Sequence, residues 1–198
     1  MIRFGYRIGF ALMAVGLIGM GIIRMQSERA GNATADADYG VVPPFSLVEA
    51  EGRTVDLQEF QGKVWIADFI FTSCAGMCPM MTSQMRKLQD ALPQDIRLVS
   101  FSVDPARDTP AVLADYAHRF GANRERWLFV TGDRQSMYDL SIKGFKLGVD
   151  DKQGTEAEPI THSSRFVLVD KDARIRGYYS GSEEEDLKRL IEDAKRLL

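Results

Sequence analysis

The hydrophobic pattern of the chain is dominated by a short, nearly continuous apolar run. The segment from Lys63 to Phe71 is interrupted only by Asp68. A strand that helices cover on both faces shows such a run, whereas a strand with one wet face alternates apolar and polar residues. The pattern therefore predicts a central strand of a parallel sheet at Lys63–Phe71, and a second buried strand at Ile96–Val103.

Helical segments separate the predicted strands, and each ends at a recognisable stop signal. The four helices are expected at about Pro79–Leu92, at Pro110–Phe120 before Gly121, from Gly132-Asp133 to about Ile142, and from a Ser182 cap to Leu198. The remaining strands are expected as a hairpin over Phe45–Val55, a short strand at Trp127–Val130, and a pair at Arg165–Val169 and Ile175–Tyr179. Val149–Glu158 is polar and is left without structure.

Strands that alternate with helices predict an α/β protein with three layers and a mixed, mostly parallel sheet, in which the closing strand pair adds an antiparallel edge. The order β-α-β-α-β-β-α, with two cysteines just after the first central strand, is the layout of a thioredoxin-like fold. In open α/β sheets the chemistry lies beyond the carboxyl ends of the strands. Cys74 and Cys78 fall at that position.

The amino-terminal segment does not belong to this pattern. Arg3 and Arg7 precede an uncharged run from Ile8 to Ile23, which Arg24 closes. The run is slightly short for a bilayer, but the flanking arginines can reach the interface. We expect a membrane anchor or signal at residues 1–26, a tether at 27–41 and the thioredoxin-like domain at 42–198.

Three interpretations of this segment remain open. An uncleaved anchor is favoured over a signal peptide cleaved near Ala33-Thr34-Ala35, and over a buried helix of the domain. The basic flank places the amino terminus in the cytoplasm, so the globular domain would lie outside the cytoplasmic membrane.

Charge excludes one class of partner. Three of the 25 basic residues lie in the first 24 positions, which leaves 22 basic against 28 acidic residues in the rest of the chain. A nucleic-acid-binding domain needs a basic face. We therefore expect no nucleic-acid partner.

The cysteine loop, Phe71–Pro79, carries the first candidate chemistry. Cys74 and Cys78 are the only two cysteines of the chain, and a bridge that closes so short a loop would stabilise the fold little. Pro79 suits the first turn of a helix, so Cys78 is expected at or beside the N-cap, where the helix dipole favours a thiolate. A redox pair, two ligands to a soft metal, a plain disulfide and two packed thiols all remain open.

Two histidines complete the list of candidate ligands. His118 is expected at a helix end, as a solvated side chain beside Arg119. His162 lies in Thr161-His162-Ser163-Ser164, just before a strand that faces the cysteine loop in a thioredoxin fold. Asp104 and Asp108 are interpreted mainly as turn or cap residues, and the Met77, Met81, Met85 stripe as a helix core face.

Three stretches make the chain resemble the SCO/SenC family of copper-handling proteins, over about Val42–Leu197. They are Phe69–Cys74 continuing to Cys78-Pro79, the run Ser102–Pro110, and His162 with Arg165–Asp170. The resemblance implies that Cys74, Cys78 and His162 bind one copper ion. It also implies a role in assembling the binuclear copper centre of cytochrome c oxidase. Where the family commonly has Pro-Asp between the cysteines, this chain has Ala75-Gly76.

The donor set agrees with that implication. Two thiolates and an imidazole suit Cu(I), and Cu(II) if a further donor approaches. A structural zinc site would want a fourth ligand, and an iron–sulfur cluster more thiolates. We expect a metallochaperone that delivers copper to the copper-bearing subunit of cytochrome c oxidase or to another copper protein. The alternatives are an enzyme, a thiol–disulfide reductase using Cys74 and Cys78, and more weakly a copper sensor.

Overall fold

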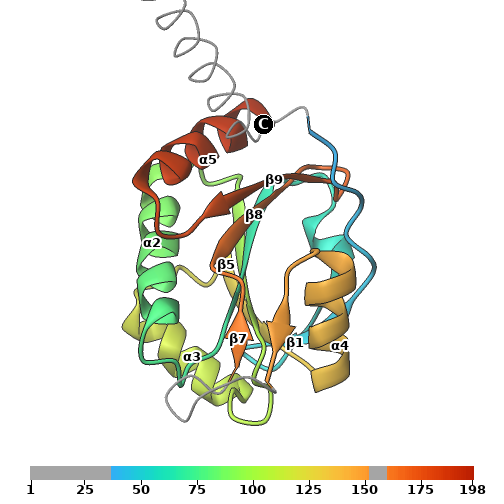
Figure 1. Ribbon diagram of the computed structural model, residues 1–198, viewed down its shortest axis with the longest axis vertical. Helices are drawn as coiled ribbons and strands as arrows, with labels where there is room; N and C mark the ends of the chain where they lie inside the picture. Colours follow the sequence, from blue (N-terminus) through green and yellow to red (C-terminus); the bar gives the residue numbers. More distant parts are fainter. Residues whose placement is uncertain (1–36, 152–159) are drawn as a thin grey trace, which may run out of the picture. The chain divides into compact units, whose positions relative to one another are not determined.

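A seven-stranded mixed sheet runs through the centre of the protein (Figure 1). The structure is a computed structural model that describes residues 37–151 and 160–198, all within one compact unit, Thr34–Leu198. The strand order is β2-β1-β5-β4-β3-β8-β9. The strands are β1 (Ser46–Glu49), β2 (Thr54–Asp56), β3 (Trp65–Ile70), β4 (Arg97–Ser102), β5 (Trp127–Thr131), β8 (Arg165–Val169) and β9 (Ile175–Ser180).

The predicted α/β architecture is confirmed, but the sheet is not mostly parallel. Among the described strands only β3–β4 and β4–β5 pair in parallel. The pairs β1–β2, β1–β5, β3–β8 and β8–β9 are antiparallel. The difference arises at the edges, because the first hairpin joins the sheet beside β5 and the last joins beside β3.

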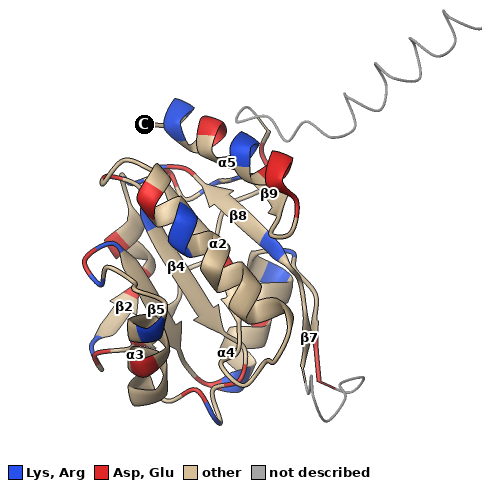
Figure 2. Ribbon diagram, turned by 90° about the vertical axis from the view of Figure 1, so that its left-hand side faces the viewer, with Lys and Arg blue, Asp and Glu red and all other residues tan. Residues whose placement is uncertain are grey.

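Helices cover both faces of the sheet, which gives three layers (Figure 1). On one face lie α2 (Met77–Ala91), α3 (Pro110–Arg119) and α5 (Glu184–Arg196), which Figure 2 views from the front. On the other face lies α4 (Arg134–Asp139), which continues as a π-helical turn, η2 (Leu140–Gly144). A 3₁₀ turn, η1 (Leu57–Phe60), and a small two-stranded ribbon of β6 (Val149–Asp150) and β7 (Thr161–His162) complete the fold.

The central strand β3 is buried along its whole length, as its apolar run predicts. Phe69 packs against Phe101 and Phe145, with ring centroids 5.1 and 5.3 Å apart, and so belongs to the α4 side of the core. Successive side chains of a strand point to opposite faces. Asp68 therefore points toward the α2 side, where the cysteines lie.

Several predicted element boundaries are shifted. Helix α2 begins at Met77, two residues before Pro79, with Gly76 as an N-cap that makes no side-chain bond. The N-cap of α5 is Glu183, and not Ser182. The third predicted helix ends its α-helical part at Asp139 and changes to a π turn. The ribbon β6–β7 is absent from the sequence prediction because two-residue strands carry no periodicity.

The start of the described chain is fixed to the edge of the sheet along β9. The Tyr39 amide donates to the Ile175 carbonyl at 3.0 Å, and the Val42 amide donates to the Ala173 carbonyl at 2.9 Å. Asp38 forms an ion pair with Arg174 at 2.7 Å. The last residues of the predicted tether thus lie along β9, while its earlier residues and the predicted anchor lie outside the described residues. Within residues 37–151 and 160–198, no helix combines the length and apolar character that a bilayer crossing needs.

Arg126 closes the turn between α2 and β4. Its guanidinium is buried and donates to the carbonyls of Leu92, Pro93 and Ile96 at 3.3, 2.9 and 3.1 Å. Replacing Arg126 by Met should lower the free energy of unfolding by about 3 kcal/mol, because three carbonyls lose their donor. Arg124→Met removes only an exposed ion pair with Glu51 and should change stability little. Urea denaturation measures both, and equal losses would contradict this role of Arg126.

Candidate metal centre

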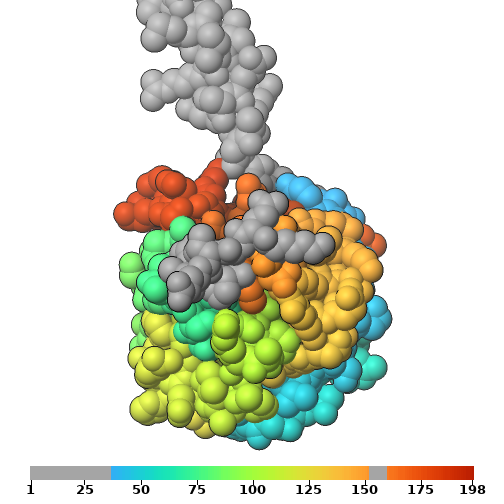
Figure 3. Space-filling model, turned by 60° about the horizontal axis from the view of Figure 1, so that its bottom comes forward, coloured from blue at the N-terminus to red at the C-terminus, as the bar shows by residue number. Residues whose placement is uncertain are grey.

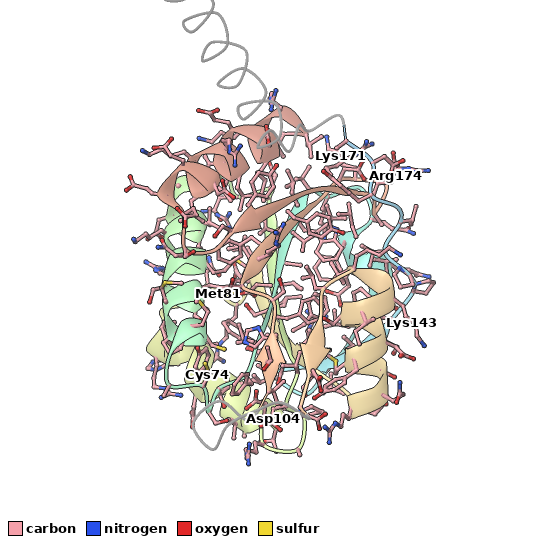
Figure 4. All side chains as sticks on the ribbon, viewed as in Figure 1. Cys74, Met81, Asp104, Lys143, Lys171 and Arg174 are labelled. Atoms are coloured by element: carbon pink, nitrogen blue, oxygen red, sulfur yellow. The ribbon has the colours of Figure 1, made fainter. Side chains whose placement is uncertain are left out.

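The cysteine loop leaves the carboxyl end of β3 and leads directly into α2. Figure 4 shows Cys74 at this end of the molecule, with Met81 further along α2. A turn closes where the Cys74 amide donates to the Phe71 carbonyl at 3.3 Å. The Cys78 amide then donates to the Cys74 sulfur at 3.4 Å. Both thiols are free and buried, with 6% and 0% of their residue surface exposed.

The ribbon β6–β7 brings His162 to the same place. Its Nε2 lies 3.0 Å from the Cys78 sulfur, although 84 residues separate the two in the chain. Its Nδ1 lies 3.1 Å from the Ser163 carbonyl oxygen, which assigns the proton to Nδ1. Nε2 therefore presents its lone pair to the thiol. The Phe71 ring stands edge-on to the imidazole, with centroids 5.5 Å apart, and restricts its rotation.

The expectation of a thiolate at Cys78 is wrong for the metal-free protein. Burial raises the pKa of Cys78 well above that of an ordinary thiol, and the neighbouring Cys74 raises it further. No charged residue occurs between Phe71 and Pro79, and the start of α2 is uncharged in Figure 2. The dipole of the helix is thus outweighed by desolvation. A metal ion that binds here must displace the Cys78 proton.

The three predicted ligands are gathered but not yet closed around one point. Cys78 and His162 are in contact, whereas the Cys74 sulfur faces the Cys78 amide. Among the described residues, no three Cys, His, Asp or Glu side chains are already arranged to hold a metal ion. His118 lies apart, exposed in the last turn of α3.

Comparison with known proteins identifies the family. The sequence profile of SCO1/SenC matches residues 33–198. The chain belongs to the SCO1/SenC family. The resemblance predicted from the sequence is thereby confirmed.

The SCO1/SenC relatives cover most of the chain. The SCO1 protein homolog of Bacillus subtilis is 37% identical over 158 residues, which is 78% of this chain and 81% of that protein. A putative copper-binding protein of Stutzerimonas stutzeri is 32% identical over 144 residues, covering 69% of this chain and 68% of that protein.

A solved SCO structure confirms the predicted thioredoxin-like fold. BsSco, described as a Sco-family cytochrome c oxidase assembly protein with a disulfide switch, superposes with a TM-score of 0.72 at 34% identity. The match covers 81% of this chain and 95% of that structure.

The segment of the SCO motif that follows β4 contacts the start of the cysteine loop, where the Thr72 amide donates to Asp108 at 3.1 Å. Figure 3 looks onto this end of the molecule, where the β4–α3 connection lies beside the β6–β7 ribbon. Asp104, labelled with Cys74 at the same end in Figure 4, is nearly buried and pairs with Arg107 at 3.1 Å. The interpretation of Asp104 as a turn residue fits the Arg107 amide, which donates to the Asp104 carbonyl at 3.1 Å.

The methionine stripe divides into two parts. Met81 and Met85 are fully buried, which confirms them as core. Met77 is 40% exposed at the first residue of α2 and lies outside that core. Helical spacing alone could not show this difference, because α2 starts at Met77 and has no preceding turn to cover it.

Two carboxyl groups near the site, those of Asp68 and Asp108, are buried, which the sequence did not reveal. Asp68 is wholly buried on the α2 side of β3, and neither of its oxygens makes a hydrogen bond among the described residues. Burial raises the pKa of Asp68 to about 7. Asp108 is also wholly buried, but accepts hydrogen bonds from the end of β3 and of β4. In the sequence, Asp68 was visible as the one interruption of the apolar run, but the expected copper site assigned it no role.

Proposed function

We propose that this protein is a copper metallochaperone that binds one copper ion through Cys74, Cys78 and His162. The contact of 3.0 Å between the Cys78 sulfur and His162 Nε2 carries the proposal, because it joins two soft ligands from distant parts of the chain. The Cys74 sulfur, beside the Cys78 amide, supplies the third ligand. Two thiolates and an imidazole favour Cu(I). Copper is the cargo of such a protein.

The recipient that we propose is the binuclear copper site of cytochrome c oxidase. Support comes from the description of BsSco as an oxidase assembly protein and from the copper-binding name of the Stutzerimonas stutzeri relative. A partly open site suits a carrier, since an ion held by three ligands leaves a position for a ligand of the receiving protein.

Copper titration of the fully reduced protein tests this function. We expect one Cu(I) per chain, and His162→Ala should weaken the affinity by at least about tenfold, since even partners outside the ligand set contribute that much. His118→Ala is the matched control, because that imidazole is exposed in the last turn of α3, whereas both cysteines are buried. Competition with a chromophoric Cu(I) chelator gives the affinities. Unchanged binding in His162→Ala, or equal losses in both variants, would refute the proposed ligand set.

A thiol–disulfide reductase is the second candidate. Two free thiols at the carboxyl end of β3 in a thioredoxin-like fold favour it, as does the disulfide switch described for BsSco. One thiolate of the protein would attack a client disulfide, and the other would release the client as two thiols while Cys74–Cys78 becomes oxidised. This chemistry needs no soft ligand at His162. His162→Ala should therefore spare reduction of a client disulfide and weaken copper binding.

We also propose that the domain lies outside the cytoplasmic membrane, anchored by residues 1–26. The basic residues Arg3 and Arg7 before the uncharged run Ile8–Ile23 support this placement. Membrane fractionation of the full chain, compared with a variant that lacks residues 2–24, tests it. Recovery of both forms in the membrane fraction would contradict the anchor.

A further inference from the structure

A buried carboxylate ties the cysteine loop to the neighbouring strand. Asp108 lies at the end of the β4–α3 connection and is wholly buried. It accepts hydrogen bonds from the Thr72 amide at 3.1 Å, the Thr72 hydroxyl at 2.5 Å and the Ser102 hydroxyl at 2.6 Å. Two of the three donors thus belong to one residue, and that residue stands two positions before Cys74.

Asp108 is not needed to cap the helix that follows. Thr109 is the N-cap of α3, and its own side chain accepts from the Val112 amide at 3.4 Å. The Asp108 side chain instead accepts hydrogen bonds from Ser102, at the carboxyl end of β4, and from Thr72, just after β3. A buried carboxylate is costly unless donors surround it. The donors at Thr72 and Ser102 offset this cost, and through Thr72 the carboxylate is bonded to the start of the cysteine loop.

The loop has few other restraints. Its other hydrogen bonds are those of the Cys74 amide to the Phe71 carbonyl and of the Cys78 amide to the Cys74 sulfur. The N-cap Gly76 has no side chain to cap α2, and Ser73, Ala75 and Gly76 are exposed. The hydrogen bonds at Thr72 therefore restrain the path of the chain from the end of β3 to Cys74. Cys74 carries the one sulfur of the proposed site that does not yet touch His162, so its approach depends most on the geometry of this loop.

We infer that Asp108 is a positioning residue, which through Thr72 sets the direction from which the Cys74 sulfur reaches a metal held by Cys78 and His162. The inference rests on the proposed function, since it concerns that same copper site. Asp108 itself contacts none of the three ligands through any hydrogen bond described here. In this inference its effect on copper runs through Thr72, while the Ser102 hydroxyl fixes the Asp108 carboxylate itself.

Substitutions at both ends of the contact test the inference. Asp108→Ala should weaken Cu(I) binding about tenfold to a hundredfold, the range typical of residues that orient metal ligands. Thr72→Val loses only the hydroxyl bond and should lie between this variant and the wild type. Thr72→Ser keeps both bonds and should restore wild-type affinity. In the Cu(II) form, the sulfur-to-copper charge-transfer band should shift in the first two variants and remain in place in Thr72→Ser.

A buried carboxylate elsewhere separates positioning from general stability. Asp193 is nearly buried in α5, where it accepts a hydrogen bond from the Tyr179 hydroxyl at 2.6 Å on the α5–β9 side of the domain. Asp193→Asn should lower the melting temperature without changing copper affinity or the absorption band. If Asp193→Asn weakens copper as much as Asp108→Ala, the effect is one of stability and the inference fails.

The coupling between Asp108 and Thr72 provides the decisive comparison. In the double variant, the loss of copper affinity should be no larger than in Asp108→Ala alone, because one contact is removed in both cases. Additive losses would show that the two residues act separately and would overturn the inference. If Asp108→Ala does not fold, Thr72→Val against Thr72→Ser gives the same decision. A wild-type protein that binds no copper refutes the proposed function, whereas wild-type affinity in every variant refutes only the positioning.

Discussion

Serine in place of Cys78 should lower the Cu(I) affinity of the reduced protein by more than about a hundredfold, beyond the loss that follows from removing a partner of a ligand. Cys78 supplies the sulfur that touches His162 Nε2, and a hydroxyl is a poor ligand for a soft ion. Chelator competition at fixed pH measures the change. Ser73→Ala is the control, since this exposed residue of the same loop makes no hydrogen bond with either cysteine among the described contacts.

Oxidation gives a second route to the same loss without a substitution. When Cys74 and Cys78 form a disulfide, neither sulfur is a thiolate that can bind a metal. Wild-type protein that is oxidised before Cu(I) is added, with no reductant present, should remain free of copper. Stoichiometric copper in protein whose disulfide is demonstrably intact, or tight binding by Cys78→Ser, would exclude these sulfurs as ligands.

Asparagine in place of Asp68 should stabilise the protein at pH 8 by up to about 4 kcal/mol and hardly at all near pH 4. Burial raises the pKa of Asp68 from 3.8 to about 7, so the folded protein retains a proton that the unfolded chain has lost. Between these two values stability falls by about 1.4 kcal/mol per pH unit as the pH rises. The stability that the protonated Asp68 carboxyl group contributes is fully present below pH 4 and is lost as the pH rises through 7.

Urea denaturation of Asp68→Asn and wild type from pH 4 to pH 8 measures this dependence. Asparagine resembles the neutral acid at every pH, so the difference in unfolding free energy should widen with pH. Asp115→Asn, on the exposed side of α3, is the control and should leave its difference nearly constant. A constant difference for Asp68→Asn would mean that the carboxyl group is ionised in the folded protein throughout this range.

The fold could be predicted because its core elements carry strong local patterns. The apolar run of β3, interrupted only by Asp68, indicated helices on both faces, and the stops at Pro93 and Gly121 separated the helices from the strands. The places where the two hairpins join the sheet could not be predicted in the same way. Antiparallel addition of β1 beside β5 depends on pairing between distant segments, which leaves no periodic signal in either.

In the site, too, some features could be predicted from the sequence and others depend on the folded structure. Cys74, Cys78 and His162 could be named as candidates because few side chains form soft ligands and the fold brings their segments together, and the resemblance to the SCO/SenC family implied them as the ligand set. The protonated state of Cys78 could not, since the N-cap rule describes an exposed helix start and this thiol is buried. The role of Asp108 was also hidden. An acid before Thr-Pro at a helix start is typical of capping, and its contact with Thr72, 36 residues away, arises only in the folded protein.

Tyr39 and Val42 attach the start of the described chain to β9 and to the turn before it, and the place of this attachment bears on the proposed delivery of copper. The chain enters beside Arg174, which Figure 4 shows at the end of the molecule opposite Cys74 and Asp104. A force applied to the chain ahead of Tyr39 would therefore act first on the edge strand β9. The central strand β3 and the ribbon that carries His162 make no hydrogen bond with Tyr39 or Val42 among the described contacts. For the proposed delivery of copper, residues 39–42 therefore lie at the end of the domain opposite the cysteine loop that a receiving protein would approach.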